Sequence, residues 1–514
     1  MRRLIKALSQ SIGAMLLGAF AGLLAVAGGT KAVVIVPAVA MVTAFVLWPY
    51  SGLYAVIATI PVNVELVGPI TVSRLAILLG LLAIMVQAAK RQVPMPRLSI
   101  WPEGTLALAF FCWVILATLI VGGGGYVGKL GPWIIFAIIL FVLLNYVDTQ
   151  ERLRSVFVLL AIMGGLQGLF VLSQAYLGFS PFGGWHATLA ADQADGEIRV
   201  AGTSSHPIIL AGFFQTAIGA TVCLLLIENK ALRRFLWLGC LAFAIWGWWF
   251  TFARSSWIGS SMMVFAGLFF MHPATRRLAV IAGIFIFVVL AIFDFSPGAI
   301  IRFIESFGSV QAASSTAGVA EGSESLSWRT ENWSGAFRIF LQHPILGIGI
   351  DASKAAMLAN LPQGAIAHQF ISAEVPHNLF LLLLAELGIV SFALFIGMLV
   401  MAFRGLWRAC GDPQLRPYAV AVAAIFLGQL TTFFFNPIPR EIWLSLGLSL
   451  AISRMGRAAV PAASRKGRAP MRRPKSQAPK PFQGRQTLRD RGRSGQGHGP
   501  APRPLRPAGP ARRS

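Results

Sequence analysis

Four polar residues stand out in this apolar chain because each lies where a membrane protein could do chemistry. Arg199 precedes the turn-rich segment 201–207, Arg254 lies between two apolar runs, and Arg329 opens an amphipathic stretch. A guanidinium presents a planar fork of N–H donors that fits phosphate oxygens. His377 lies where a long polar segment returns to an apolar run, and a neutral imidazole can accept the proton of a hydroxyl nucleophile. Together they predict a polyanion pocket with a base beside it.

Each of these residues also has an ordinary structural explanation. An arginine can snorkel to the membrane surface or pair with a nearby carboxylate, of which the candidates are Asp195, Glu197, Asp294 and Glu331. His377 could cap a helix, and His206 and His343, each followed by proline, are typical of turns and helix starts. The long polar segments contain no HxxxH, HExxH or paired-carboxylate motif. We therefore expect no metal site and no cofactor.

The four residues must be positioned by membrane helices. Of the 514 residues, 56% are hydrophobic and only 12% are charged, whereas soluble domains carry roughly 25% charged residues. The apolar runs are long enough to cross hydrocarbon as helices, which satisfy their own backbone amides. We expect an all-α polytopic membrane helix bundle of about 12–14 transmembrane helices, at 10–28, 32–48, 51–67, 72–89, 104–121, 131–147, 154–177, 207–227, 235–252, 256–271, 277–293, 378–403, 417–435 and 440–453.

The charges of the loops orient this bundle. Basic residues collect in alternate loops, and such loops face the cytoplasm. They are Lys90, Arg91 and Arg97; Arg152 and Arg154; Lys230, Arg233 and Arg234; Arg276 and Arg277; and Arg404, Arg408 and Arg416. Both termini are then cytoplasmic. Two long segments, 178–206 and 294–377, lie on the outer face together with all four candidate residues.

The chain is expected to divide at residue 453. Residues 1–453 form the membrane domain, with 294–377 as its large outer loop. Within that loop 309–325 is predicted to be flexible. Residues 328–340 are predicted to form an amphipathic helix at the membrane surface or over the mouth of a cavity, with Trp333, Phe337 and Phe340 near one face. Residues 454–514 hold 17 of the 43 Lys and Arg residues and a single acid. Such a tail cannot bury enough surface to fold, so we expect a disordered arm near anionic cytoplasmic lipids, without nucleic acid as a partner.

Four segments in this order resemble the O-antigen ligase and polymerase superfamily of bacterial membrane proteins. They are Arg199-Val-Ala-Gly-Thr-Ser-Ser-His-Pro207, Thr251-Phe-Ala-Arg-Ser-Ser-Trp257, the run from Arg329 through Trp333 to Gln342-His-Pro-Ile-Leu-Gly-Ile-Gly349, and Val375-Pro-His-Asn378 with Glu386-Leu-Gly388. The likeness covers about residues 130–450 and is strongest between Arg199 and Gly388.

The resemblance implies a fold similar to that of C-type glycosyltransferases. It implies a metal-independent enzyme of the bacterial inner membrane that takes a glycan from a polyprenyl-diphosphate-linked donor at the periplasmic face. The acceptor is a sugar hydroxyl, either on lipid A-core (ligase) or on another lipid-linked repeat (O-antigen or exopolysaccharide polymerase). Carried onto this chain, Arg199 and Arg254 bind the diphosphate, His377 activates or positions the acceptor, and Arg329 serves donor binding or loop order. Membrane lipids and glycan-assembly proteins are the implied partners.

Two other classes of function remain open from the residues alone. A transporter or flippase of lipid-linked sugar would also have many helices and a basic cavity, although such proteins tend to show internal repeats and broken helices. A structural protein could recruit partners through its basic tail. The choice between ligase and polymerase also stays open, since both use the same donor.

Overall fold

The computed structural model describes 48–63, 65–67, 70–97, 102–122, 128–178, 190–192, 197–204, 206–270, 321–360, 376–434 and 440–467. The helices predicted at 10–28, at 277–293 and, apart from Trp48, at 32–48 lie outside these residues, as does the segment 468–514. The number of membrane helices and the disorder of the tail therefore stay predictions.

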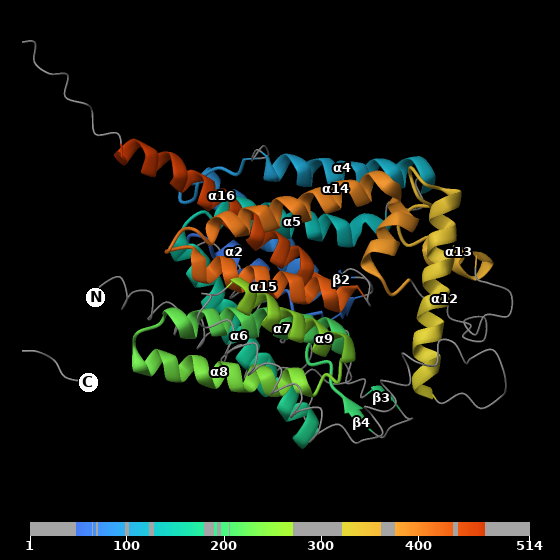
Figure 1. Ribbon diagram of the computed structural model, residues 1–514, viewed down its shortest axis with the longest axis horizontal. Helices are drawn as coiled ribbons and strands as arrows, with labels where there is room; N and C mark the ends of the chain where they lie inside the picture. The colour runs from blue at the N-terminus through green and yellow to red at the C-terminus, as the bar shows by residue number, and fades with distance from the viewer. Residues whose placement is uncertain are drawn as a thin grey trace, which may run out of the picture. The chain divides into compact units, whose positions relative to one another are not determined.

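Helices make up nearly all of the described chain (Figure 1). They are α2 (Ser51–Ala58), α3 (Val72–Ala89), α4 (Glu103–Gly122), α5 (Gly131–Tyr146), α6 (Gln150–Leu177), α7 (Pro207–Ile227), α8 (Ala231–Trp249), α9 (Arg254–Phe270), α12 (Glu321–Gln342), α13 (Ser353–Asn360), α14 (Leu379–Ala409), α15 (Arg416–Phe433) and α16 (Arg440–Gly467). Within the described residues, six segments are long and apolar enough to cross a membrane, namely α3, α4, Gly128–Tyr146, α6, α7 and α14. The predicted all-helical membrane fold is confirmed.

Local sequence signals start several of these helices. The Thr71 and Thr149 hydroxyls accept hydrogen bonds from the backbone N–H groups of Arg74 and Arg152, each at 3.3 Å, and so cap α3 and α6. His206 caps α7, with Pro207 in the first turn. A capping side chain satisfies an N–H that has no partner within the helix, and proline fits the first turn because its missing N–H is not needed there.

The helix predicted over 51–67 is wrong in its second half. In the structure α2 ends at Ala58, and the chain then turns and forms a short hairpin of β1 (Glu65–Val67) and β2 (Ile70–Thr71). Pro61 explains the early end, because it lacks a backbone N–H and its ring would clash with the carbonyl one turn earlier. A second hairpin, β3 (Ala190–Asp192) with β4 (Glu197–Arg199), lies in the segment before α7.

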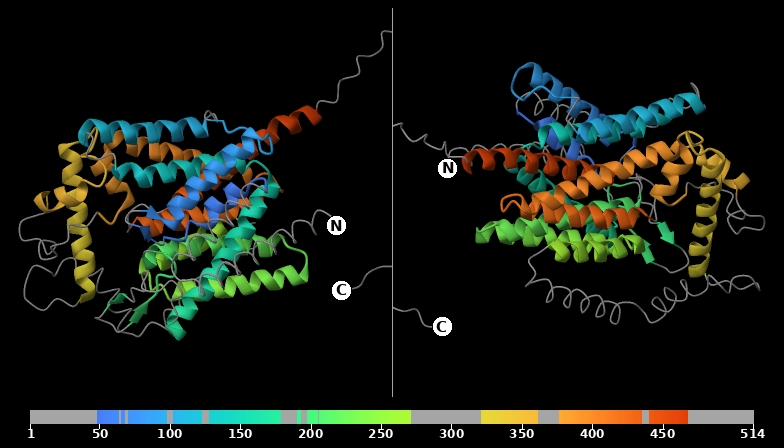
Figure 2. Two further views of the ribbon diagram at one scale, coloured as in Figure 1. Left: turned by 180° about the vertical axis from the view of Figure 1, so that it is seen from behind. Right: turned by 45° about the horizontal axis from the view of Figure 1, so that its top comes forward.

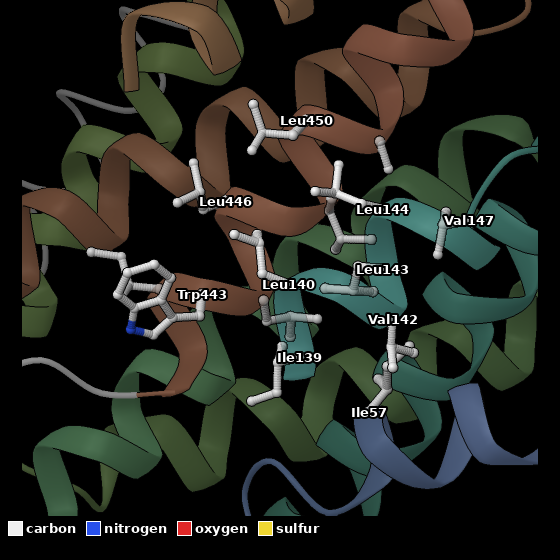
Figure 3. Close-up of a cluster of buried hydrophobic side chains, with 14 of the residues drawn as sticks. Ile57, Ile139, Leu140, Val142, Leu143, Leu144, Val147, Trp443, Leu446 and Leu450 are labelled. Carbon is white, nitrogen blue, oxygen red and sulfur yellow. The ribbon is translucent and has the colours of Figure 1, made fainter. Parts of the chain in front are cut away.

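The core of the bundle centres on α16, α5 and the helices around them. Figure 3 shows Trp443, Leu446 and Leu450 of α16 beside Leu140 and Leu143 of α5, and all five side chains are at most 1% exposed. The Trp443 ring also stacks on Phe136, with ring centroids 5.5 Å apart, and lies 6.0 Å from Phe395 of α14. Aromatic packing of this kind stabilises a core beyond its buried area.

The predicted cytoplasmic loops gather at one end of the bundle, which we call the basic end. Tyr146 donates a hydrogen bond to the Pro94 carbonyl at 3.2 Å, joining the loops that follow α3 and α5. Gln150 donates to the Gln414 carbonyl at 3.1 Å, which adds the loop before α15. The loop between α7 and α8 joins α6 through Arg154 and Glu228, 2.8 Å apart. This grouping agrees with the membrane topology predicted from loop charge. The side of the membrane that the basic end faces stays a prediction.

α12 and α16 extend well beyond their predicted limits, and α6, α8 and α14 also differ from theirs by four to six residues at an end. α12 begins at Glu321, so 321–325, which were expected to be flexible, are helical. Figures 1 and 2 draw α12 across the ends of α4 and α14 rather than along them. α16 continues past residue 453 to Gly467. Near its end, Arg457 forms an ion pair with Glu103 of α4, whose side chain is fully buried.

Candidate functional site

The structure places the backbones of all four candidate residues at the boundaries of elements or in the loop helix. Arg199 ends β4, where it pairs with Ala190, and Arg254 is the first residue of α9. Arg329 lies within α12, and His377 comes directly before Asn378, the N-cap of α14. The side chains of the three arginines are outside what the structure describes. Their predicted roles, and their alternative pairing with carboxylates, therefore stay open.

The segments that carry Arg199 and Arg254 lie side by side. The backbone N–H of Val200 donates to the Phe250 carbonyl at 3.3 Å. Phe250 closes α8, and its ring also contacts Phe252, with centroids 6.3 Å apart. Phe252 has a φ of 44°, an unfavourable conformation for a residue with a side chain. A strained turn therefore leads into Arg254 next to the strand that ends at Arg199.

The segments of Arg329 and His377 meet at Phe434, which follows α15. The Phe434 ring lies 5.5 Å from that of Trp333, one turn after Arg329 on α12. It also lies 6.2 Å from the ring of Phe380, in the first turn of α14 after His377. Three aromatic rings thus join α12, α14 and α15 at the end of the bundle opposite the basic end.

A buried polar junction fixes α9, the helix of Arg254, to the same end of α15. The Gln215 amide on α7 donates to the Ser256 carbonyl at 2.9 Å and to the Thr432 hydroxyl at 2.9 Å. Gly259 allows this approach, because a Cβ there would lie 2.0 Å from the Thr432 hydroxyl oxygen. Since Thr432 is two residues before Phe434, the first turn of α9 lies close to the aromatic junction. The elements of all four candidates therefore converge on this end.

His377 does not cap α14, so that alternative is wrong. The Asn378 side chain oxygen accepts from the backbone N–H groups of Phe380 and Leu381 at 2.9 and 3.0 Å. The His206 imidazole instead caps α7, accepting from the Ile208 N–H at 3.2 Å. His343 follows the end of α12 and is exposed. Both of these were expected at turns or helix starts, which is confirmed.

α14 is interrupted at Gly388, where the long loop docks onto it. Gly388 has a φ of 74°, which is favourable only for glycine. The break leaves carbonyl groups of α14 without partners inside the helix, and backbone N–H groups of the loop bond to them. The Ile348 N–H donates to the Ala385 carbonyl at 3.1 Å, and the Gly349 N–H donates to the Glu386 carbonyl at 2.9 Å. The Trp113 indole of α4 donates to the Leu387 carbonyl at 3.0 Å. Buried carbonyls need such partners.

The carboxylate of Glu386 adds a side-chain bond to this docking. It is 4% exposed, and its Oε1 accepts from the Ser353 hydroxyl at 2.6 Å, at the start of α13. In the sequence, Gln342–Gly349 and Glu386–Gly388 stand out only as parts of the family resemblance. The structure gives them a shared physical role, since they are the two surfaces that hold α12 and α13 against α14.

The amphipathic character of α12 is confirmed, and its buried apolar residues are small or aliphatic. Ala336 and Ile339 are buried and pack with Met357 of α13 and Ala385 of α14. Phe337 is 46% exposed and contacts Phe340. The small and aliphatic residues thus face the protein, whereas of the predicted aromatic face Phe337 is exposed and Trp333 contacts Phe434.

Sequence reasoning missed one arginine whose side chain the structure does describe. Arg440 opens α16 and donates to the Asn63 side chain at 3.0 Å, to Ser73 and to the Val62 carbonyl. Asn63 in turn donates its backbone N–H to the carbonyl of Thr203, in the loop after Arg199. Only its place at the start of an apolar run could have drawn attention to it. Among the described residues, no three His, Cys, Asp or Glu side chains lie together as metal ligands would.

Together, the helices and this convergent end define a polytopic, all-helical membrane protein with its polar loop elements docked at one end. Residues 239–396 match a protein-family model described as O-antigen ligase. The matched segment includes Arg254, Arg329 and His377, while Arg199 lies before it. The chain is also similar to an O-antigen ligase of Pseudomonas aeruginosa, with 30% identity over 132 residues. That match covers 24% of this chain and 29% of the length of the relative.

Proposed function

We propose that the chain is a membrane glycosyltransferase of the O-antigen ligase type. It transfers a glycan from a polyprenyl-diphosphate-linked donor to a sugar hydroxyl at the periplasmic face of a bacterial inner membrane. The observation that carries the proposal is the position of His377, which directly precedes the N-cap of α14 where the segments of the three arginines converge. The family match, which includes His377, supports it.

In the proposed reaction the acceptor hydroxyl oxygen attacks the anomeric carbon of the donor sugar. The bond from that carbon to the diphosphate oxygen breaks, and polyprenyl diphosphate leaves with the electron pair. His377 takes the proton of the hydroxyl as the new glycosidic bond forms. Arg199 and Arg254 stabilise the negative charge that develops on the leaving group, with Arg329 assisting in donor binding or loop order. Fixed donors aimed at developing charge lower the barrier, and losing one typically costs about 10²–10³ in rate.

The acceptor decides between ligase and polymerase. The purified full chain in nanodiscs is given a lipid-linked glycan and either lipid A-core or a second lipid-linked repeat. Transfer to lipid A-core assigns a ligase, and growth of the lipid-linked glycan assigns a polymerase. Transfer is expected to continue with a chelator present. Loss of activity in chelator alone would contradict the metal-independent mechanism.

The central test is His377→Ala, with His343→Ala as the matched control. Removing a general base is expected to lower the transfer rate by about 10²–10⁴. His343 is exposed at the end of α12, so its alanine variant should transfer at the wild-type rate. Wild-type transfer by well-folded His377→Ala protein would exclude the proposed role of His377.

A further inference from the structure

Among the described residues, the Arg440 side chain donates hydrogen bonds only to neutral groups. Its Nη2 donates to the Asn63 oxygen at 3.0 Å, and its Nη1 donates to the Val62 carbonyl at 3.4 Å and to the Ser73 hydroxyl. No described carboxylate lies within ion-pair distance, although Glu441 is the next residue in the chain. The charge of this half-buried guanidinium is therefore not balanced by an ion pair within the described chain.

The donors of Arg440 are only partly used. A guanidinium has five N–H groups, and the three bonds above occupy both hydrogens of Nη1 and one of Nη2. The second Nη2 hydrogen and the Nε hydrogen have no acceptor among the described residues. A guanidinium with unused Nε and Nη2 hydrogens can bind two oxygens of a phosphate or carboxylate.

Two further positive features lie near Arg440. Arg74, in the first turn of α3, is half-buried and close enough for its charge to act on Arg440. Arg440 also begins a 28-residue helix, whose N-terminal backbone N–H groups attract negative charge.

The surroundings indicate which kind of anion fits. Asn63, which holds Arg440, donates its backbone N–H to the Thr203 carbonyl at 2.9 Å, and Thr203 follows Arg199 by four residues. Arg440 thus lies at the end of the bundle opposite the basic end, at the start of an apolar helix. An anion there must sit at the boundary between hydrocarbon and water, as the headgroup of a membrane amphiphile does.

We propose that Arg440, with Arg74 beside it, binds the phosphoryl headgroup of a membrane lipid. Asn63 and Ser73 act as positioning residues that hold the fork open toward the ligand. The same chemistry is offered by two lipids, a polyprenyl diphosphate and a bilayer phospholipid such as phosphatidylglycerol. The site does not depend on the proposed transfer reaction, because the binding is measured without acceptor or turnover.

The test measures lipid binding by the full chain in nanodiscs of phosphatidylcholine. Polyprenyl diphosphate and phosphatidylglycerol are titrated separately, with native mass spectrometry and the shift in unfolding temperature as readouts. Arg440→Gln is expected to weaken binding of one of the two lipids by about tenfold or more, the loss expected for a charge-assisted hydrogen bond. The lipid whose binding falls identifies the source of the headgroup.

Two control variants separate binding from support of the fold. Arg408→Gln removes an exposed arginine at the end of α14 and should bind both lipids as the wild type does. Ser73→Ala removes one acceptor of Arg440 but leaves its unused Nε and Nη2 hydrogens, so binding should fall less than in Arg440→Gln. Equal losses in Ser73→Ala and Arg440→Gln would show that Arg440 only holds the fold together, and the proposal would be wrong.

Arg440→Lys provides a test if Arg440→Gln does not fold. Lysine keeps the charge but cannot hold three acceptors and present two more donors, so it should bind the lipid more weakly than the wild type. Wild-type affinity of Arg440→Lys for both lipids would overturn the two-point binding of the headgroup. If His377→Ala retained transfer while Arg440→Gln lost lipid binding, the proposed function would fail and this site would stand.

Discussion

Gly388 of α14 lies so close to Ile345, in the loop after α12, that no residue with a side chain would fit at position 388. A Cβ atom on Gly388 would lie 2.0 Å from the Ile345 carbonyl oxygen, well inside van der Waals contact. The φ of 74° at Gly388 excludes most L-residues independently. This contact fixes the position along α14, the helix that begins beside His377, at which the long loop docks.

Gly388→Ala should therefore undock the loop. Backbone strain alone is expected to cost about 1–3 kcal/mol, and the clash with Ile345 adds to it. We expect a lower unfolding temperature in detergent and loss of glycan transfer. Gly239→Ala in α8 is the control, because no atom lies within 4 Å of its added Cβ and alanine favours a helix. Equal unfolding temperatures for the two variants would contradict the docking role.

Arg254→Lys tests how the proposed diphosphate site holds its ligand. Lysine keeps the charge but loses the planar fork, so it should impair transfer nearly as much as Arg254→Ala. The measurement is transfer from purified lipid-linked donor in nanodiscs. Arg234→Lys, in the first turn of α8 at the basic end, should transfer at the wild-type rate. Near-normal turnover by Arg254→Lys would rule out two-point binding.

The C-terminal segment has a structural boundary that a pair of truncations can locate. A chain ending at Gly467 keeps all of α16 and should retain its unfolding temperature and transfer activity. A chain ending at Ser453 loses Arg457, which pairs with the fully buried Glu103. Leaving a buried charge without its partner costs about 3–5 kcal/mol. If both truncated chains unfolded at the same temperature, the Arg457–Glu103 pair would contribute nothing measurable.

Glu228 should make the basic end sensitive to acid. Burial alone would raise the pKa of Glu228, but the Lys230 backbone N–H and the charges of Arg154 and Arg233 outweigh it and lower the pKa below its ordinary value. A group with a lowered pKa in the folded state stabilises the protein at neutral pH. That contribution is lost as the pH falls through the folded pKa, below the ordinary glutamate range.

The measurement is the unfolding temperature between pH 7 and about pH 3. The wild type should lose more stability on acidification than Glu228→Gln, which starts lower and changes less. Glu151→Gln, an exposed residue in the first turn of α6, should follow the wild type. Parallel curves for the wild type and Glu228→Gln would show that Glu228 does not act in this way.

Much of the helical framework can be predicted from the sequence. α3 and α7 occupy the residues expected from their apolar runs, and α4, α5 and α9 differ by only one or two at each end. The reason is that hydrocarbon imposes a length and composition on each spanning helix, whatever its neighbours are. Loop charge likewise predicted which loops gather at the basic end. The order Arg199, Arg254, Arg329 and His377 indicated a family by resemblance, and the comparison supports it.

The tertiary structure alone decided how the polar elements are joined. Asn378 and not His377 caps α14, Glu386 bonds Ser353 across the chain, and Arg440 reaches Asn63 far away in the sequence. None of these pairs has a periodicity or spacing in the sequence, because each depends on where a loop docks. The break at Gly388 illustrates the reason. A single glycine in an apolar run is compatible with a continuous helix, and only the docking of another backbone segment against it produces the break.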